Sequence, residues 1–183
     1  MNILYLRRLL ITLHLWIAGL LAPAFLIVAV SGGLYIAGIE GKAKQTPLEL
    51  PTDVQLELGS ETFEADVRQL IDSQGLNVDF EYVRGGPDRA QTRPTTRTFL
   101  TFQQTPDGIE AALNTPDFPY ALLELHKGHG PQAYRYYQIL VALALFLVVV
   151  GGVAVGLLAK NYRRSTGIAL VGGSLVAALL AIL

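Results

Sequence analysis

Three long stretches of the sequence carry no formal charge, and they limit what this chain can fold into. They are residues 9–30, 139–158 and 165–183, and His14 is the one side chain within them that titrates near neutral pH. A helix rises about 1.5 Å per residue, so about 20 apolar residues cross the roughly 30 Å hydrocarbon core of a bilayer. The pattern predicts three transmembrane helices, the third being just long enough to span.

The first stretch has two interpretations. Arg7 and Arg8 precede it, as basic residues precede the apolar part of a secretory leader. Such a leader has an apolar run of only about 7–15 residues, whereas this run is longer. We therefore expect the first stretch to be a membrane anchor.

The charged residues predict the orientation of the chain in the membrane. All 15 acidic residues lie between Glu40 and Glu124, and residues 40–130 carry eight basic residues, which gives this segment a net charge of −7. Most other basic residues lie at the N-terminus or in residues 159–164. Basic loops stay on the cytoplasmic side, so residues 40–130 and the C-terminus are expected on the far side. In a bacterium with two membranes this places the acidic segment in the periplasm and the protein in the inner membrane.

Composition also restricts the partners. An acidic domain repels nucleic acid and anionic lipid headgroups, so we expect no nucleic-acid partner. The chain has no cysteine, which excludes disulfides and thiolate sites. The expected partners are the lipid bilayer and either other membrane subunits or further copies of the chain.

Between the first two apolar stretches the pattern predicts a small α+β domain. Residues 60–74 read as an amphipathic helix with Ser60 as its N-cap and Gly75 as its stop signal. Its apolar face is expected to hold Phe63, Val67, Leu70 and Ile71.

Three antiparallel strands are expected after this helix, at residues 78–83, 97–104 and 109–114. The turn at Pro106-Asp107-Gly108 has hairpin chemistry, because proline pre-sets φ and glycine accepts a left-handed conformation. The proline-containing segment 41–53 is expected to be a linker, and the segment 84–96 a loop. The predicted organisation is a cytoplasmic N-terminus at 1–8, a helix at 9–38, a periplasmic domain at 39–130, a helix at 131–159, a cytoplasmic loop at 160–165 and a helix at 166–183.

This order of features resembles a known family. The segment "LHLWIAGLLAPAFLIVAVSGGLY", the helix followed by strands at 60–115, and "LLELHKGHG" before a long helix are similar to PepSY-associated transmembrane proteins. The resemblance implies a PepSY-like periplasmic domain. Some members of that family bind haem and reduce iron–siderophore complexes, others are small anchored modules, and soluble PepSY domains are associated with peptidase inhibition.

The three histidines are the candidate cofactor ligands. His126 and His129 lie three residues apart, so on a helix they would share a face and serve one metal ion with Glu124. They cannot be the two axial ligands of one haem, and His14 is expected about 30 Å away in depth. Haem b would therefore need ligands from a second chain. The alternative is that His14 is an interfacial polar group, and that His126 and His129 mark the membrane surface.

Other residues have simpler interpretations. Glycines allow close helix packing, and the candidates are Gly151, Gly152 and Gly156. A membrane-interface belt is expected at Trp16, Tyr35, Tyr134, Arg135, Tyr136 and Tyr137. An arginine run within the acidic domain either docks an acidic group or is simply solvated: Arg84, Arg89, Arg93 and Arg97.

No hydrolase, metalloprotease or nucleotide-binding motif occurs in the sequence. We therefore expect a non-enzymatic, membrane-anchored PepSY-like module that binds a partner protein, as an accessory or regulatory subunit of a larger inner-membrane complex. The alternatives are a haem-binding electron carrier and a peptidase inhibitor.

Overall fold

The computed structural model describes residues 3–51 and 56–183. Residues 1–2 of the predicted cytoplasmic N-terminus and residues 52–53 of the predicted linker lie outside this part of the chain. The chain forms two compact units. The helical unit comprises the chain up to Leu26 together with Ile139–Leu183, and the sheet unit comprises Ile27–Gln138.

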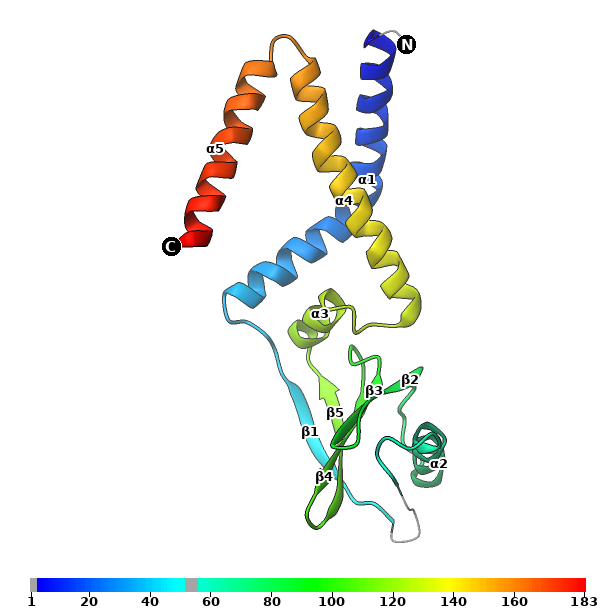
Figure 1. The fold of residues 1–183 in the computed structure, drawn as a ribbon. Coiled ribbons are helices and arrows are strands. Elements are labelled where there is room, and N and C mark those ends of the chain that lie inside the picture. The colour runs from blue at the N-terminus through cyan, green and yellow to red at the C-terminus, as the bar shows by residue number, and fades with distance from the viewer. Residues whose placement is uncertain (1–2, 52–55) are drawn as a thin grey trace. The chain divides into compact units, whose positions relative to one another are not determined.

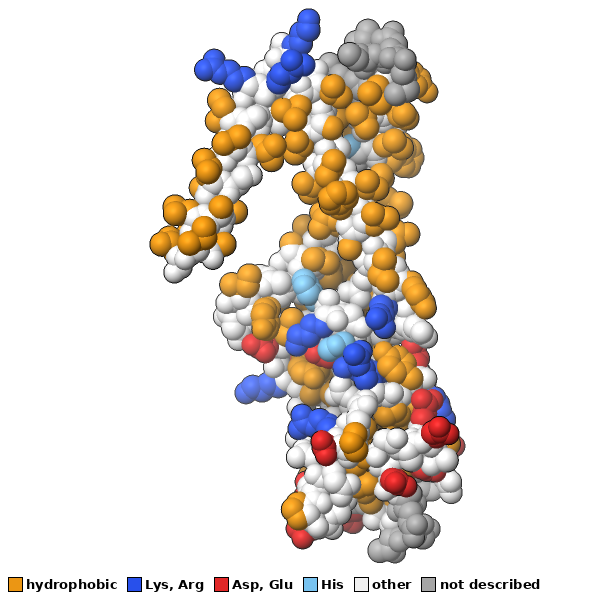
Figure 2. Space-filling view, in the orientation of Figure 1, with side chains coloured by type: hydrophobic (Ala, Val, Ile, Leu, Met, Phe, Trp, Pro, Cys, Tyr) orange, Lys and Arg blue, Asp and Glu red, His pale blue; other side chains and the backbone are white. Residues whose placement is uncertain are grey.

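Three helices are long and apolar enough to cross a membrane: α1 (Ile3–Ile36), α4 (Gln132–Leu158) and α5 (Arg163–Ile182). This confirms the three apolar helices predicted from the sequence. Helix α5 begins three residues before the predicted start, because arginine is a good helix former and extends the helix beyond the apolar run. Figure 2 shows hydrophobic side chains spread over the surface of all three helices, as contact with lipid requires.

Within the helical unit, α1 and α4 pack through a small apolar contact. Leu21 and Ala24 of α1 meet Val141 and Ala144 of α4, and all four side chains are buried. Alanine at two of the four positions allows the backbones to approach closely. None of the residues of α5 is buried within the chain, so most of its surface remains for lipid or another protein.

The sheet unit contains a five-stranded antiparallel sheet in the order β1-β5-β4-β3-β2 (Figure 1). The strands are β1 (Ala43–Leu48), β2 (Tyr82–Gly85), β3 (Arg89–Arg93), β4 (Phe99–Thr105) and β5 (Gly108–Pro116). The α+β class is confirmed, but the prediction of three strands is wrong. The predicted hairpin between the last two strands is present, since Thr105 pairs with Gly108.

The sequences of the two strands that were not predicted are not typical of β-strands. Strand β1 lies in the predicted linker and contains Pro47, which a sheet tolerates here because β1 is an edge strand. Strand β3, with the sequence "RAQTR", lies in the predicted loop and contains no large aliphatic residue. The strand predicted at 78–83 is displaced, because regular pairing begins only at Tyr82.

One face of the sheet is covered by α2 (Phe63–Gln74) (Figure 1). The predicted apolar face of this helix is confirmed, and the helix ends at Gly75 in the left-handed conformation, as expected. Its N-cap is Thr62 rather than Ser60. The core between α2 and the sheet is formed by Phe63, Val67, Leu70, Ile71, Val78, Phe80, Ala90, Leu100, Phe102 and Ala111, together with Leu58.

A further helix, α3 (Phe118–His126), was not predicted. Asp117 caps it by accepting a hydrogen bond from the Tyr120 backbone N–H at 2.9 Å. The helix ends before Gly128, which has φ 77°, and α4 begins at Gln132. The chain therefore breaks between α3 and α4 at residues 127–131.

Candidate functional site

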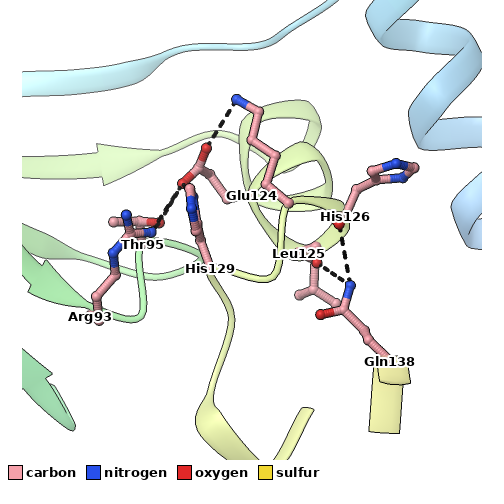
Figure 3. A network of polar contacts seen from close by, with 8 residues as sticks. Arg93, Thr95, Glu124, Leu125, His126, His129 and Gln138 are labelled. Carbon is pink, nitrogen blue, oxygen red and sulfur yellow. Dashed lines mark hydrogen bonds and ion pairs between the residues drawn. The ribbon is translucent and has the colours of Figure 1, made fainter. Parts of the chain in front are cut away.

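The side chain of Glu124 is the centre of a buried polar cluster in the sheet unit (Figure 3). Its Oε2 accepts hydrogen bonds from Thr95 Oγ1 at 2.5 Å and from His129 Nδ1 at 2.7 Å. Lys127 Nζ lies 3.3 Å from Oε1, and Arg93 Nη1 lies 3.6 Å from Oε2. Only 6% of Glu124 is exposed, so a charged carboxylate needs these partners. We call these five residues the Glu124 cluster.

The Glu124 cluster joins two connections of the chain. Arg93 ends β3, Thr95 follows it in the connection to β4, and His129 lies between α3 and α4. The Thr95 backbone N–H donates to the His129 carbonyl at 3.1 Å, and the His129 N–H donates to the Glu124 carbonyl at 2.9 Å. Thr95 Oγ1 also accepts a hydrogen bond from Arg93 Nη1 at 3.0 Å. These contacts fix α3 against one end of the sheet.

The cluster is held together by charge as well as by hydrogen bonds. Burial acts to raise the pKa of Glu124, but hydrogen bonds from Thr95 and His129, the charge of His129 and a contact from Lys127 outweigh it, so the pKa is lowered overall. Burial lowers the pKa of Arg93, while the charge of Glu124 opposes that shift. The ionised carboxylate is thus the stable form in the folded protein.

His126 lies on the other side of α3 and contacts α1. Its Nδ1 is 2.7 Å from the hydroxyl of Ser31, which is buried. The same hydroxyl lies 2.7 Å from the carbonyl of Ile27, one turn earlier in α1. A hydroxyl has one proton, so when Ser31 donates to Ile27 it accepts from His126 Nδ1. His126 therefore ties the end of α3 to the last turns of α1.

The structure does not bring the two neighbouring histidines together. In Figure 3 the imidazoles of His126 and His129 lie on opposite sides of the end of α3, and each Nδ1 is engaged by a different oxygen. Within the described part of the chain, no group of three or more metal-ligating side chains is assembled. Glu124 contacts His129 but not His126, so the three do not form the metal site that their spacing suggested.

His14 lies in the helical unit, where it faces α4. A β-carbon added at Gly152 would lie 3.4 Å from His14 Cε1, so the imidazole packs against the glycine backbone. His14 Nδ1 is buried and has no hydrogen-bond partner among the described residues. A β-carbon at Gly156 would collide with the side chain of Thr166 on α5, whereas one at Gly151 would meet nothing within 4 Å. The glycines thus face two different helices.

The residues of the predicted interface belt are mostly exposed. Tyr134 is half-buried, and its ring lies 5.7 Å from the ring of Tyr137. Trp16 has 74% of its surface exposed within this chain. The other exposed members are Tyr35, Arg135, Tyr136 and Tyr137.

The face of the sheet opposite α2 is open and hollowed. A groove of about 750 Å³ runs over it, and side chains from β1, β3, β4 and β5 form its floor. The lining mixes apolar side chains with seven polar ones: Gln45, Arg89, Gln91, Thr101, Gln103, Glu110 and Asn114. We call this surface the open face. A sheet face buried inside a domain is lined by apolar residues alone, whereas this lining is mixed, as on a face that is half solvated.

Helix α3 connects the open face to the Glu124 cluster. Tyr120 lines the groove, and its ring stacks on Phe99 of β4 with centroids 6.4 Å apart and an interplanar angle of 11°. Burial raises the pKa of Tyr120, and the negative charge of Glu124 raises it further. The side chains of one short helix thus reach the groove, the cluster and, through His126, helix α1.

The predicted arginine run is divided by the fold. Arg93 is buried in the Glu124 cluster, Arg97 pairs with Asp79 at 2.9 Å, and Arg89 lies on the open face. Sequence reasoning did not find the open face, although one signal was available. The hairpin turn sets Gln103 opposite Glu110, and both are polar.

Comparison of the chain with protein-family models, with curated proteins and with solved structures finds no match.

Proposed function

We propose that this protein is a membrane-anchored, non-enzymatic module whose sheet unit binds a partner protein. In this proposal it is an accessory or regulatory subunit in a bacterial inner membrane, with the sheet unit in the periplasm. The resemblance to PepSY-associated membrane proteins belongs to the same proposal.

The observation that carries this proposal is the open face. A groove of about 750 Å³, whose lining combines carboxamide, hydroxyl and charged side chains with apolar ones, lies on a sheet whose other face packs against the core. Carboxamides both donate and accept hydrogen bonds, as peptide groups do. A surface of this kind is suited to a polypeptide ligand.

The Glu124 cluster supports a binding role rather than a catalytic one. Each carboxylate oxygen is engaged by a side chain of the chain itself, at 2.5–3.3 Å. The cluster joins α3 to the sheet, and this is a structural role. In this proposal its role is to hold Tyr120 in place at the end of the groove.

Site-specific photocrosslinking tests the proposal. A photoreactive amino acid is placed at Gln91 on the open face, and in a matched variant at Gln69, which is exposed on α2 at the opposite face. In native membranes we expect a crosslinked protein adduct from position 91 and none from position 69. No adduct at position 91, or equal adducts from both positions, would contradict the proposal. Identification of the adduct as a peptidase would favour the inhibitor function.

A second candidate is haem binding through His14. Its Nδ1 is buried without a partner among the described residues, and a buried imidazole nitrogen without a partner costs free energy unless something binds the ring. His14 is the one histidine of the helical unit, so a bis-histidine haem would need a second copy. A reduced-minus-oxidised visible spectrum of the purified protein tests this. A b-type α-band that His14→Ala abolishes would support it, and a pure, folded sample without Soret absorption would exclude it.

A further inference from the structure

We infer that helix α3 lies on the surface of the membrane and that its exposed apolar face, which begins at Phe118, inserts into the lipid layer between the headgroups and the acyl chains. This contact is a lipid-binding surface outside the three long apolar helices. It does not depend on the partner protein of the proposed function.

Phe118, in the first turn of α3, is an exception on the surface of the sheet unit. Its side chain is 78% exposed, and in the described part of residues 40–131 no other large apolar side chain is exposed. A single exposed ring needs no explanation by itself, whereas a continuous apolar patch marks a contact with a protein or a membrane. Phe118 belongs to such a patch, because two further sets of apolar side chains adjoin it.

The first set lies on α3 itself. Phe118, Leu122 and Leu125 occupy positions i, i+4 and i+7, so they share one face of the helix, and the two leucines remain partly exposed. At about 100° per residue, Tyr120 and Glu124 lie on the opposite side, which faces the groove and the Glu124 cluster. We call the side with Phe118, Leu122 and Leu125 the Phe118 face. Helix α3 thus packs on the sheet with one side and leaves the Phe118 face available.

The second set lies where α1 ends. Tyr35, Ile36 and Ile39 are 51%, 87% and 50% exposed. The Gly38 N–H donates to the Tyr35 carbonyl at 3.0 Å, and the Ile39 N–H donates to the Leu34 carbonyl at 2.8 Å, with Gly38 at φ 75°. This is the closing turn typical of a helix that ends at a glycine, and it keeps Ile39 beside the last turn of α1. The end of α1 therefore presents a compact apolar surface.

Both ends of α3 are fastened to this end of α1. At its start, the Asp117 N–H donates to the Lys42 carbonyl at 2.9 Å, and the Lys42 N–H donates to Asp117 Oδ2 at 2.9 Å. At its end, His126 contacts Ser31, which lies five residues, or about 7.5 Å, before Ile36. Figure 1 shows α3 at the same end of the sheet unit as the last turns of α1. The Phe118 face is thus held close to the apolar end of α1.

The length of α1 sets the depth of this patch. Its candidate membrane span, Arg8–Ile36, has 29 residues and is therefore about 43 Å long. A bilayer with its headgroup layers is about 40–45 Å thick, so the end of α1 reaches the far headgroup layer. Amphipathic helices with Phe and Leu on the apolar side lie in the plane of that layer, with the apolar side buried. Lipid is therefore the occupant that the position of the Phe118 face favours over a soluble protein.

Fluorescence quenching by brominated lipid tests the contact. The full-length protein is placed in nanodiscs of phosphatidylcholine, either plain or brominated near the top of the acyl chains, where bromine quenches an indole that touches it. The chain has one tryptophan, so the background variant is Trp16→Phe, and Phe118→Trp adds an indole at the site. We expect a loss of fluorescence in brominated nanodiscs and a blue-shifted emission. Because Phe118 is exposed and lies outside the core, far-UV circular dichroism is expected to match that of the parent.

Two matched variants in the same background provide the controls. Tyr120→Trp places the indole on the opposite side of the same helix, and Gln69→Trp places it on the exposed surface of α2. Both are expected to lose less fluorescence in brominated nanodiscs than Phe118→Trp. Acrylamide, a quencher dissolved in water, is expected to quench Gln69→Trp more than Phe118→Trp. Lipid quenching at position 118 that does not exceed the quenching at positions 120 and 69 would overturn the inference.

The nanodisc contains no protein other than this chain, so strong quenching at position 118 identifies lipid as the occupant of the Phe118 face. The photocrosslinking result at position 91 is independent of it. Quenching at position 118 without a crosslinked adduct would support the lipid contact and contradict the proposed function. An adduct without quenching would do the reverse.

Discussion

The substitution Glu124→Gln removes the charge from the buried cluster while keeping the shape of the side chain. Arg93, which is 5% exposed, then keeps its charge without the buried counter-charge 3.6 Å away. In the parent, Thr95 and His129 both donate hydrogen bonds to the Glu124 carboxylate. Glutamine has an N–H₂ group in place of one carboxylate oxygen, so two donors can face each other and a hydrogen bond is lost. Both effects destabilise the attachment of α3 to the sheet.

The expected loss of stability is about 3 kcal/mol. Removal of one partner of a buried ion pair costs about 3–5 kcal/mol, and the lower end applies here because Lys127 and His129 are partly exposed. Hydrogen–deuterium exchange by mass spectrometry on the full-length protein in micelles measures this. A loss of about 3 kcal/mol accelerates exchange through unfolding by roughly 150-fold, and we expect this in peptides that cover β4 and the connection before it.

The matched control is Asp79→Asn, which removes an exposed ion pair. Asp79 bonds Arg97 at 2.9 Å, but its side chain is 80% exposed, so we expect a loss below about 1 kcal/mol and a change in exchange of less than about fivefold. If Glu124→Gln and Asp79→Asn change the exchange of β4 equally, the view that the Glu124 cluster holds α3 on the sheet is wrong.

Three further predictions follow from individual positions. The folded pKa of Glu124 lies below its unfolded value of about 4.3, so the stability that the carboxylate contributes is present above pH 4.3 and is lost as the pH falls through the folded pKa. Measurements of the free energy of unfolding at decreasing pH are expected to show this loss in the parent and not in Glu124→Gln. Gly41→Ala combines a φ of +69° with a collision against the backbone of the first turn of α3, whereas Gly38→Ala has a φ of +75° but open space. Gly41→Ala is therefore expected to destabilise the fold by about 2 kcal/mol more than Gly38→Ala, and equal losses in thermal unfolding would contradict this. Gly156→Leu is expected to separate α4 from α5 and lower the thermal midpoint in micelles, whereas Gly151→Leu leaves it unchanged; the reverse order would disprove the packing.

Helix α3 shows how the two features of the sheet unit depend on each other. Its first turn places Tyr120 on Phe99 at the groove, its middle carries Glu124 into the cluster, and its end presents His126 to Ser31. The backbone carbonyl of Leu125 also accepts a hydrogen bond from Gln138 Nε2 at 2.5 Å, so the start of α4 is tied to the same helix. A variant that loosens α3 is therefore expected to disturb the groove even when the strands persist.

The sequence by itself determined the elements whose hydrophobic pattern is long or strictly periodic. Three uncharged runs of about 20 residues have few alternatives to membrane helices, and the period of Phe63, Val67 and Leu70 leaves one face for α2 to bury. The hairpin between β4 and β5 followed from the turn chemistry and from the strand patterns on either side of it. These are local properties, so a single segment contains the information that specifies them.

Only the tertiary structure decided what the polar residues do. Strands β1 and β3 are stabilised by pairing with β5 and β4 rather than by their own composition, so no local pattern distinguished them from loops. The role of His129 depends on Glu124, and that of His126 on Ser31, which lies 95 residues earlier in the chain. A hydrophobic run needs only to leave water, whereas a polar side chain takes its function from the particular atoms that the fold brings within about 3 Å of it.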